Sequence, residues 1–216
     1  MELLSSLSDG CTIVLSPELT STQLSYFGVA LMESSLSNVT IDMSYMTITE
    51  IDSETFADCT NITSVILPSS LETIGSFAFY GCTYLAEVVI PDSVTTIENM
   101  AFSYCTALTT VTIPDSVTSI DIYVFYSCTA LTTVVIGDGV ETIPDYAFSD
   151  CTALETVTIG SGVTTIGYCA FGSCSSLKTV YYNGTKSEWA AISISSIDDY
   201  YLTQASIICS DGTYTY

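Results

Sequence analysis

Residues 93–115 read SVTTIENMAFSYCTALTTVTIPD, and the spacing within this stretch is repeated along most of the chain. Its cysteine recurs every 23 residues, at Cys59, Cys82, Cys105, Cys128, Cys151 and Cys174. A phenylalanine precedes each of these cysteines by three residues, and an aliphatic residue follows each by three. Self-similarity at a fixed period of about 20 to 50 residues is the signature of stacked repeats. The sequence therefore predicts one elongated repeat domain rather than two globular ones.

Each repeat contains a short predicted strand. In residues 108–130, Val111 and Ile113 alternate with threonines, which is the period-two pattern of a β-strand. Pro114 then ends the strand, because proline cannot donate to a strand ladder. The equivalent positions of other repeats hold Pro68, Pro91, Gly137 and Gly160. An Ala-Phe pair before most of the repeated cysteines predicts a short convex turn of helix or 3₁₀-helix.

The chain divides into four predicted segments. These are a disordered lead over 1–10, an N-terminal cap over 11–44, the repeats over 45–182 and a C-terminal cap over 183–216. In the N-terminal cap we expect a strand over Thr12–Leu15 and an amphipathic helix over 21–34, with Met32 on its apolar stripe. A degenerate first rung at Val39 and Ile41 completes a β-α-β unit. Such a cap closes the open end of a solenoid, which would otherwise expose core and unpaired strand.

The C-terminal segment leaves the repeat register. Asn183-Gly184 is a tight-turn signal. Trp189, the only tryptophan, lies 23 residues after Ile166, so we expect it to occupy the apolar position of the next rung and cover the last face of the stack. Residues 205–212 are predicted to form a closing edge strand.

Composition narrows the classes of function. The 216 residues are 48% apolar and carry 24 acidic side chains against two lysines, for a net charge of -22. This charge disfavours binding to nucleic acid and to anionic membranes. The absence of histidine removes the commonest general base and metal ligand. No apolar run is long enough for a transmembrane helix, so membrane insertion is not expected. The first ten residues lack the basic segment of a signal peptide.

The repeat at 93–115 resembles the BspA-like bacterial leucine-rich repeats. YYNGTKSEWAAISI and the later ASIICSDG resemble a C-terminal closing segment of that family, and the match extends over about 11–212. The resemblance implies a right-handed leucine-rich-repeat solenoid with a parallel, concave β-sheet. It also implies an extracellular or cell-surface protein involved in adhesion. We therefore expect a signal peptide to have been removed ahead of Met1, and a monomer.

The cysteine column allows three interpretations. Neighbouring rungs lie about 4.8 Å apart, a separation that a disulfide tolerates. However, equivalent side chains on stacked rungs point in parallel, whereas a disulfide needs converging Cβ vectors. A metal-thiolate stack lacks the close Cys or His pairs of known zinc sites. A column of buried, free thiols is favoured, because free cysteine behaves as a small apolar residue.

The acidic residues also recur in columns. Asp92, Asp115 and Asp138 follow the strands, and Glu98 and Asp121 share a second column. Calcium binding and acid–base catalysis are possible uses of paired carboxylates. Ordinary turn chemistry explains aspartate after proline or glycine better. We predict no catalytic residue, no metal site and no cofactor.

The outward positions of the strands form the candidate binding site. The inward valines are Val65, Val88, Val111, Val134, Val157 and Val180, so the alternate positions face outward. The predicted concave binding face consists of Ser64, Ile66, Glu87, Val89, Thr110, Thr112, Thr133, Val135, Thr156, Thr158, Thr179 and Tyr181. It is flat, β-branched and nearly uncharged. Strand propensity alone accounts for threonine and valine there, and a regular threonine array is also found in ice-binding solenoids. Repeat proteins use such faces to bind extended partners.

The function expected from this face is adhesion or interaction with an unidentified protein or glycan, for example in a host extracellular matrix. A passive spacer or display scaffold without a ligand is the alternative. An enzyme is not expected, because no nucleophile and base pair is apparent. Five tyrosines fall on or near the convex turns: Tyr80, Tyr104, Tyr126, Tyr146 and Tyr168. They are either interface anchors or covers of the core.

Overall fold

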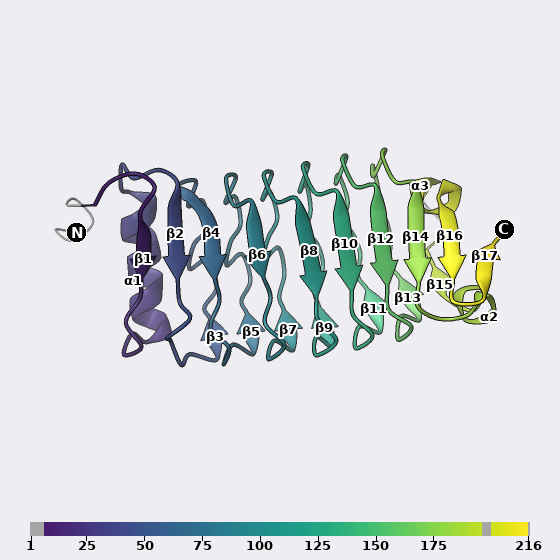
Figure 1. The fold of residues 1–216 in the computed structure, drawn as a ribbon, viewed down its shortest axis with the longest axis horizontal. Coiled ribbons are helices and arrows are strands. Elements are labelled where there is room, and N and C mark those ends of the chain that lie inside the picture. The colour runs from purple at the N-terminus through teal and green to yellow at the C-terminus, as the bar shows by residue number, and fades with distance from the viewer. Residues whose placement is uncertain (1–6, 196–199, 216) are drawn as a thin grey trace.

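The structure is a computed structural model that describes residues 7–195 and 200–215. It confirms the predicted solenoid, in which one long face is built from parallel strands (Figure 1). These main strands are β1 (Thr12–Val14), β2 (Val39–Asp42), β4 (Ile62–Ile66), β6 (Glu87–Val89), β8 (Thr110–Ile113), β10 (Thr133–Ile136), β12 (Thr156–Ile159), β14 (Thr179–Tyr182) and β16 (Ser206–Cys209). The inward valines of the repeats are buried, as predicted.

The main strands form two hydrogen-bonded blocks rather than one sheet. The order is β1-β2-β4-β6 in the first block and β17-β16-β14-β12-β10-β8 in the second, where β17 (Gly212–Tyr214) is antiparallel to β16. Backbone N–H groups after the later strands add bonds between turns, as from Gly137 to the Ile113 carbonyl at 2.9 Å. Pro91 and Pro114 have no N–H, so the turns on both sides of the division between β6 and β8 lack this bond.

Two ladders of two-residue strands run one after the other along the lower edge of the solenoid in Figure 1. The first consists of β3 (Glu50–Ile51), β5 (Thr73–Ile74), β7 (Thr96–Ile97) and β9 (Ser119–Ile120), and the second of β11 (Thr142–Ile143), β13 (Thr165–Ile166) and β15 (Ser193–Ile194). The sequence does not reveal these ladders, because two residues are too few to show a period. Stacking of identical turns is what pairs them.

The convex segments are not helical, and that prediction is wrong. They are successive turns in the described repeats. Alternate N–H groups donate to the next turn, as from Phe102 to the Val124 carbonyl at 2.9 Å, and the others donate within their own turn. Two positions in each turn take positive φ, for example Tyr123 and Ser127 near 60°. In a helix, the N–H groups would donate to carbonyls of the same helix, whereas in this conformation half of them donate to carbonyls of the neighbouring turn.

The phenylalanine and cysteine columns form the core of the repeats. The rings of Phe56, Phe79, Phe102, Phe125, Phe148 and Phe171 stack with centroids 5.2–5.4 Å apart and interplanar angles of 5–14°. From Cys82 to Cys174, each thiol donates to the carbonyl of the phenylalanine in the preceding turn, as from Cys128 to Phe102 at 3.2 Å. The Cys59 thiol, at the start of the column, donates to the Gly28 carbonyl of the N-terminal helix at 3.5 Å. The same Phe102 carbonyl accepts the Cys105 N–H at 3.3 Å. Cysteine therefore supplies a weak donor to a buried carbonyl as well as a small apolar volume.

The predicted N-terminal β-α-β cap is confirmed. Helix α1 (Ser21–Met32) begins with a capping box, in which the Thr20 hydroxyl accepts from the Gln23 N–H and the Gln23 side chain accepts from the Thr20 N–H. The buried stripe is narrower than predicted, because Met32 is exposed. Strand β1 pairs in parallel with β2. In the described part of the chain, no helix is both long and apolar enough to cross a membrane.

The disordered lead expected over residues 1–10 lies partly outside the described residues. Within the described part, the Asp9 carboxylate accepts the Ser37 N–H at 2.8 Å and the Gly10 N–H donates to the Ser37 carbonyl at 2.9 Å. These bonds attach residues 9 and 10 to the N-terminal cap.

Two predictions for the C-terminal cap are wrong in detail. Ile194, not Trp189, is the register partner of Ile166, because helix α2 (Lys186–Trp189) lengthens this rung. Trp189 is nevertheless buried, and its ring lies 5.4 Å from that of Tyr182. Strand β16 is not the edge, since β17 turns back and pairs with it. Helix α3 (Tyr200–Gln204) precedes β16.

We predict that Gly28→Ala destabilises the protein although alanine is the better helix former. A Cβ at position 28 would lie 1.7 Å from the Thr55 carbonyl oxygen, so α1 would have to move away from the first repeat. The expected loss in the free energy of unfolding is about 2 kcal/mol or more, measured by urea denaturation. Ala30→Gly on the same helix is the control and should cost only about 1 kcal/mol. A stabilised Gly28→Ala variant would contradict this packing.

Candidate functional site

The sheet face, defined as the twelve outward residues predicted above, lies on β4, β6, β8, β10, β12 and β14. Side chains alternate across a strand, so the burial of the valines turns these twelve away from the core. Register places eight of them in two columns across β8 to β14. The first column is Thr110, Thr133, Thr156 and Thr179, and the second is Thr112, Val135, Thr158 and Tyr181.

The other four residues of the sheet face lie on the first block. Ser64 pairs with Glu87, and Ile66 pairs with Val89. The division between β6 and β8 therefore splits the predicted site into a group of four and a group of eight. Sequence spacing could not show this split, because the repeat period continues unchanged through it.

The most exposed apolar side chain of the sheet face is next to this division. Val89 is 79% exposed and its partner Ile66 is 45% exposed. A hollow of about 190 Å³ opens here, and Leu67 and Pro91 contribute to its wall together with Ser64, Ile66, Glu87 and Val89. The threonines of β10, β12 and β14 are only half-exposed, because each has a paired strand on both sides.

The structure adds members from the two caps to the sheet face. Val14 and Asp42 continue the column of Ile66, and Ile208 continues the column of Tyr181. Val14 is 57% exposed. The caps break the 23-residue spacing, so counting residues could not reach these positions. Their alternation with buried Ile41 and Ile207 was the only available signal.

Charge is sparse on the sheet face. Glu87 is its only acidic member, and Asp42 extends it. Hydrogen bonds from the hydroxyl and the N–H of Ser44 lower the pKa of Asp42. The ion pair between Lys178 and Glu155, 2.8 Å apart, is well exposed and lies beside the face. Such surface pairs contribute little to stability. A nearly uncharged face is therefore presented by a chain of net charge -22.

The column of aspartates after the strands is used as backbone acceptors. The Asp138 N–H donates to the Asp115 carboxylate at 2.8 Å, and the Ser161 N–H donates to the Asp138 carboxylate at 2.7 Å. The Ser161 N–H bond is the main cause of the lowered pKa of Asp138. Residues 7–195 and 200–215 contain no group of three or more Asp, Glu, Cys or His arranged to hold a metal ion. These acids connect successive turns, in agreement with turn chemistry.

The thiols of the column are buried and none is joined in a disulfide, so the column is not a disulfide ladder. Burial raises the pKa of Cys59 and of Cys128 to about 12. It raises the pKa of Cys82, Cys105 and Cys151 well above the ordinary thiol value. A thiol is nucleophilic and metal-binding only as the thiolate. These thiols are therefore inert at neutral pH, as expected of core residues.

The comparisons with known proteins agree with this architecture. A family model described as the BspA type leucine rich repeat region matches residues 49–178 in six copies. Similar solved structures include leucine-rich repeat proteins from T. pallidum (31% identity, TM-score 0.61), Bacteroides ovatus (17%, 0.55) and Eubacterium ventriosum (29%, 0.51). No curated protein matches the chain.

Coverage of these structures is uneven. The match to the T. pallidum protein covers 66% of this chain and 72% of that protein. The Bacteroides ovatus match covers 93% of this chain and 63% of that protein. The Eubacterium ventriosum match covers 63% of this chain and 33% of that protein. At 17% identity, the Bacteroides ovatus protein supports the fold alone.

Proposed function

Because this chain belongs to the BspA type leucine-rich repeat family, we propose that it is an extracellular or cell-surface adhesion module that binds a protein or glycan through its sheet face. Leucine-rich repeat proteins are generally interaction modules, and repeat arrays bind extended partners along the surface that their stacking creates. The family and fold are typically non-enzymatic.

The exposed apolar cluster of Val89 and Ile66 on a nearly uncharged face is the observation that carries the proposal. Folding does not require apolar side chains at these two outward positions, because the inward Val65 and Val88 already fill the core behind them. Contiguous exposed apolar surface marks interaction sites in soluble proteins. An uncharged strip also lets the partner avoid the repulsion that the rest of this acidic surface imposes on anionic molecules.

A passive spacer is the second candidate. The half-exposed threonines of β10, β12 and β14 favour it, since threonine in exposed strands needs no explanation beyond strand propensity. In this case Val89 and Val135 would have no partner, and their replacement would leave all binding unchanged.

We predict that Val89→Asp and Val135→Asp each weaken binding to the partner at least tenfold. A carboxylate placed on the apolar contact must be desolvated without a counter-charge. Binding would be measured by surface immobilisation of the intact chain against a panel of extracellular matrix proteins and a glycan array. Thr118→Asp, an exposed change off the sheet face, is the control.

Far-UV circular dichroism would first establish that each variant is folded. Equal binding by Val89→Asp, Val135→Asp and the control would refute the sheet face as the site. Absence of any partner on the panel would favour the spacer.

A further inference from the structure

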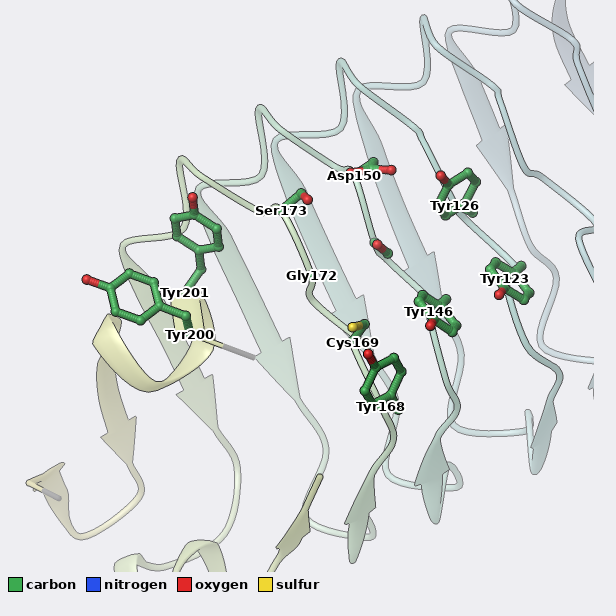
Figure 2. A pocket seen from close by; sticks show the side chains of 11 residues that line it. Tyr123, Tyr126, Tyr146, Asp150, Tyr168, Cys169, Gly172, Ser173, Tyr200 and Tyr201 are labelled. Atoms are coloured by element: carbon green, nitrogen blue, oxygen red, sulfur yellow. The ribbon is translucent and has the colours of Figure 1, made fainter. Parts of the chain in front are cut away.

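A hollow of about 610 Å³ lies on the convex side, away from the sheet face (Figure 2). In Figure 2 the main strands pass behind it. Eleven residues line the hollow, and six of them are the tyrosines Tyr123, Tyr126, Tyr146, Tyr168, Tyr200 and Tyr201. Three successive convex turns supply the first four, and α3 supplies the last two. Ligand sites typically occupy about 300–1,000 Å³.

The repeat register explains why the hollow is here. One convex position holds Tyr123 and Tyr146 and then, one turn later, Cys169. Another holds Tyr126, then Ser149 and then Gly172. At these two positions, the turn that contains Cys169 and Gly172 therefore carries small residues in place of tyrosine, while the stack itself continues. The space that these side chains would have filled is left open, with α3 as its far wall.

The ring geometry leaves aromatic faces available around this space. Tyr123 and Tyr146 stack with centroids 4.7 Å apart, and Tyr146 meets Tyr168 at 5.3 Å and 72°. Tyr126 meets Tyr123 at 79°. Edge-to-face pairs turn some ring faces outward, because only one ring of each pair presents its face to its neighbour.

One carboxylate lies among the tyrosines. Asp150 lines the hollow (Figure 2), and its hydrogen bond with the Tyr126 hydroxyl is the main reason that the pKa of Tyr126 is raised to about 12. Both lysines of the chain lie outside the lining residues of the hollow. The combination of ring faces with a negative charge attracts cations, since the face of an aromatic ring carries negative potential.

We infer that the convex hollow binds an organic cation, an arginine or alkylated ammonium group, between the faces of its tyrosines and the carboxylate of Asp150. The net charge of -22 adds long-range attraction for a basic ligand. This site is independent of the sheet face, so failure of one assignment leaves the other standing.

The test is an NMR titration of the intact chain with four probes. Acetyl-Gly-Arg-Gly-amide and choline carry the cation, while the citrulline peptide and 3,3-dimethylbutanol are their neutral isosteres. We expect the cations to bind at least tenfold more tightly than the isosteres. Preference between the two cations distinguishes a basic peptide from a small quaternary amine. Equal binding of cation and isostere, or binding of methyl glucoside in place of both cations, overturns the assignment.

Matched variants locate the site. Asp150→Asn should weaken cation binding about tenfold by removing the charge. Asp58→Asn makes the same change at the equivalent position four turns earlier, far from the hollow, and should have no effect. Cys169→Tyr restores the residue of the preceding turns at a position with the same positive φ, and should abolish binding by filling the space. Equal loss in the two aspartate variants would mean non-specific attraction and would refute the site.

Discussion

Phe102→Ala is expected to lower the free energy of unfolding by about 3–5 kcal/mol, the usual cost of removing a buried phenylalanine. Phe102 is fully buried and stacks on Phe79 and Phe125 at 5.2 Å on both sides. A solenoid is stabilised mainly by contacts between neighbouring turns. The cavity would therefore weaken two adjacent interfaces near the middle of the stack and leave the ends intact.

Urea denaturation followed by far-UV circular dichroism measures this loss. Tyr84→Ala, at a side chain that is 61% exposed, is the control and should change stability by less than about 0.5 kcal/mol. We also expect the unfolding transition of Phe102→Ala to broaden or separate into two. The parts of the solenoid before and after the turn that contains Phe102 would then unfold less cooperatively with each other. A loss no larger than that of the control would contradict the role of the phenylalanine column.

Alkaline pH is expected to unfold the chain over the range from about 9 to about 12. The thiol pKa is near 9 in the unfolded chain and about 12 for Cys59 and Cys128 in the folded chain. Below pH 9 both states keep the proton, so the stabilisation is complete. Above pH 9 the unfolded state loses protons that the folded state retains, so stability falls until the folded pKa is reached. Each such thiol contributes a slope of about 1.4 kcal/mol per pH unit.

The measurement is the free energy of unfolding at several pH values between 8 and 11 under reducing conditions. Cys128→Ala removes one thiol and should reduce the alkaline slope by about 1.4 kcal/mol per pH unit. Cys11→Ala, at a partly exposed thiol of the N-terminal cap, is the matched control. A slope that is unchanged in Cys128→Ala would show that this thiol ionises as readily in the folded chain as in the unfolded chain.

Much of the architecture was predictable because it repeats. The 23-residue spacing located the strands, the buried valines and the phenylalanine and cysteine columns, and the structure confirms them. Prediction failed where spacing changes or where bonds join different turns. Ile194 replaced Trp189 as the partner of Ile166 because α2 lengthens the last rung. The Ala-Phe pairs predict helix in the convex turns, because they do not reveal that alternate N–H groups donate to the next turn.

The candidate sites show the same limit. Alternation along each strand was enough to predict which residues of the sheet face point outward. It could not predict that Val89 would be 79% exposed, since this depends on the missing ladder between β6 and β8. The sequence places tyrosines on or near the convex turns, but it does not show that several of them line one hollow. That hollow requires α3 to lie beside the turn that contains Gly172, and α3 belongs to the C-terminal cap, where the 23-residue spacing no longer applies.

By itself, the sequence determined the solenoid, its period and its core columns. It also determined which alternate residues of each strand point into the core and which point outward. Each of these follows from local spacing, because a periodic chain of apolar residues can bury itself only by stacking equivalent turns. Tertiary structure alone decided the division of the sheet, the extent of its face into the caps and the hollow on the convex side. These depend on how neighbouring turns pair and on where the aperiodic ends fold back, and contacts between residues far apart in the chain set both.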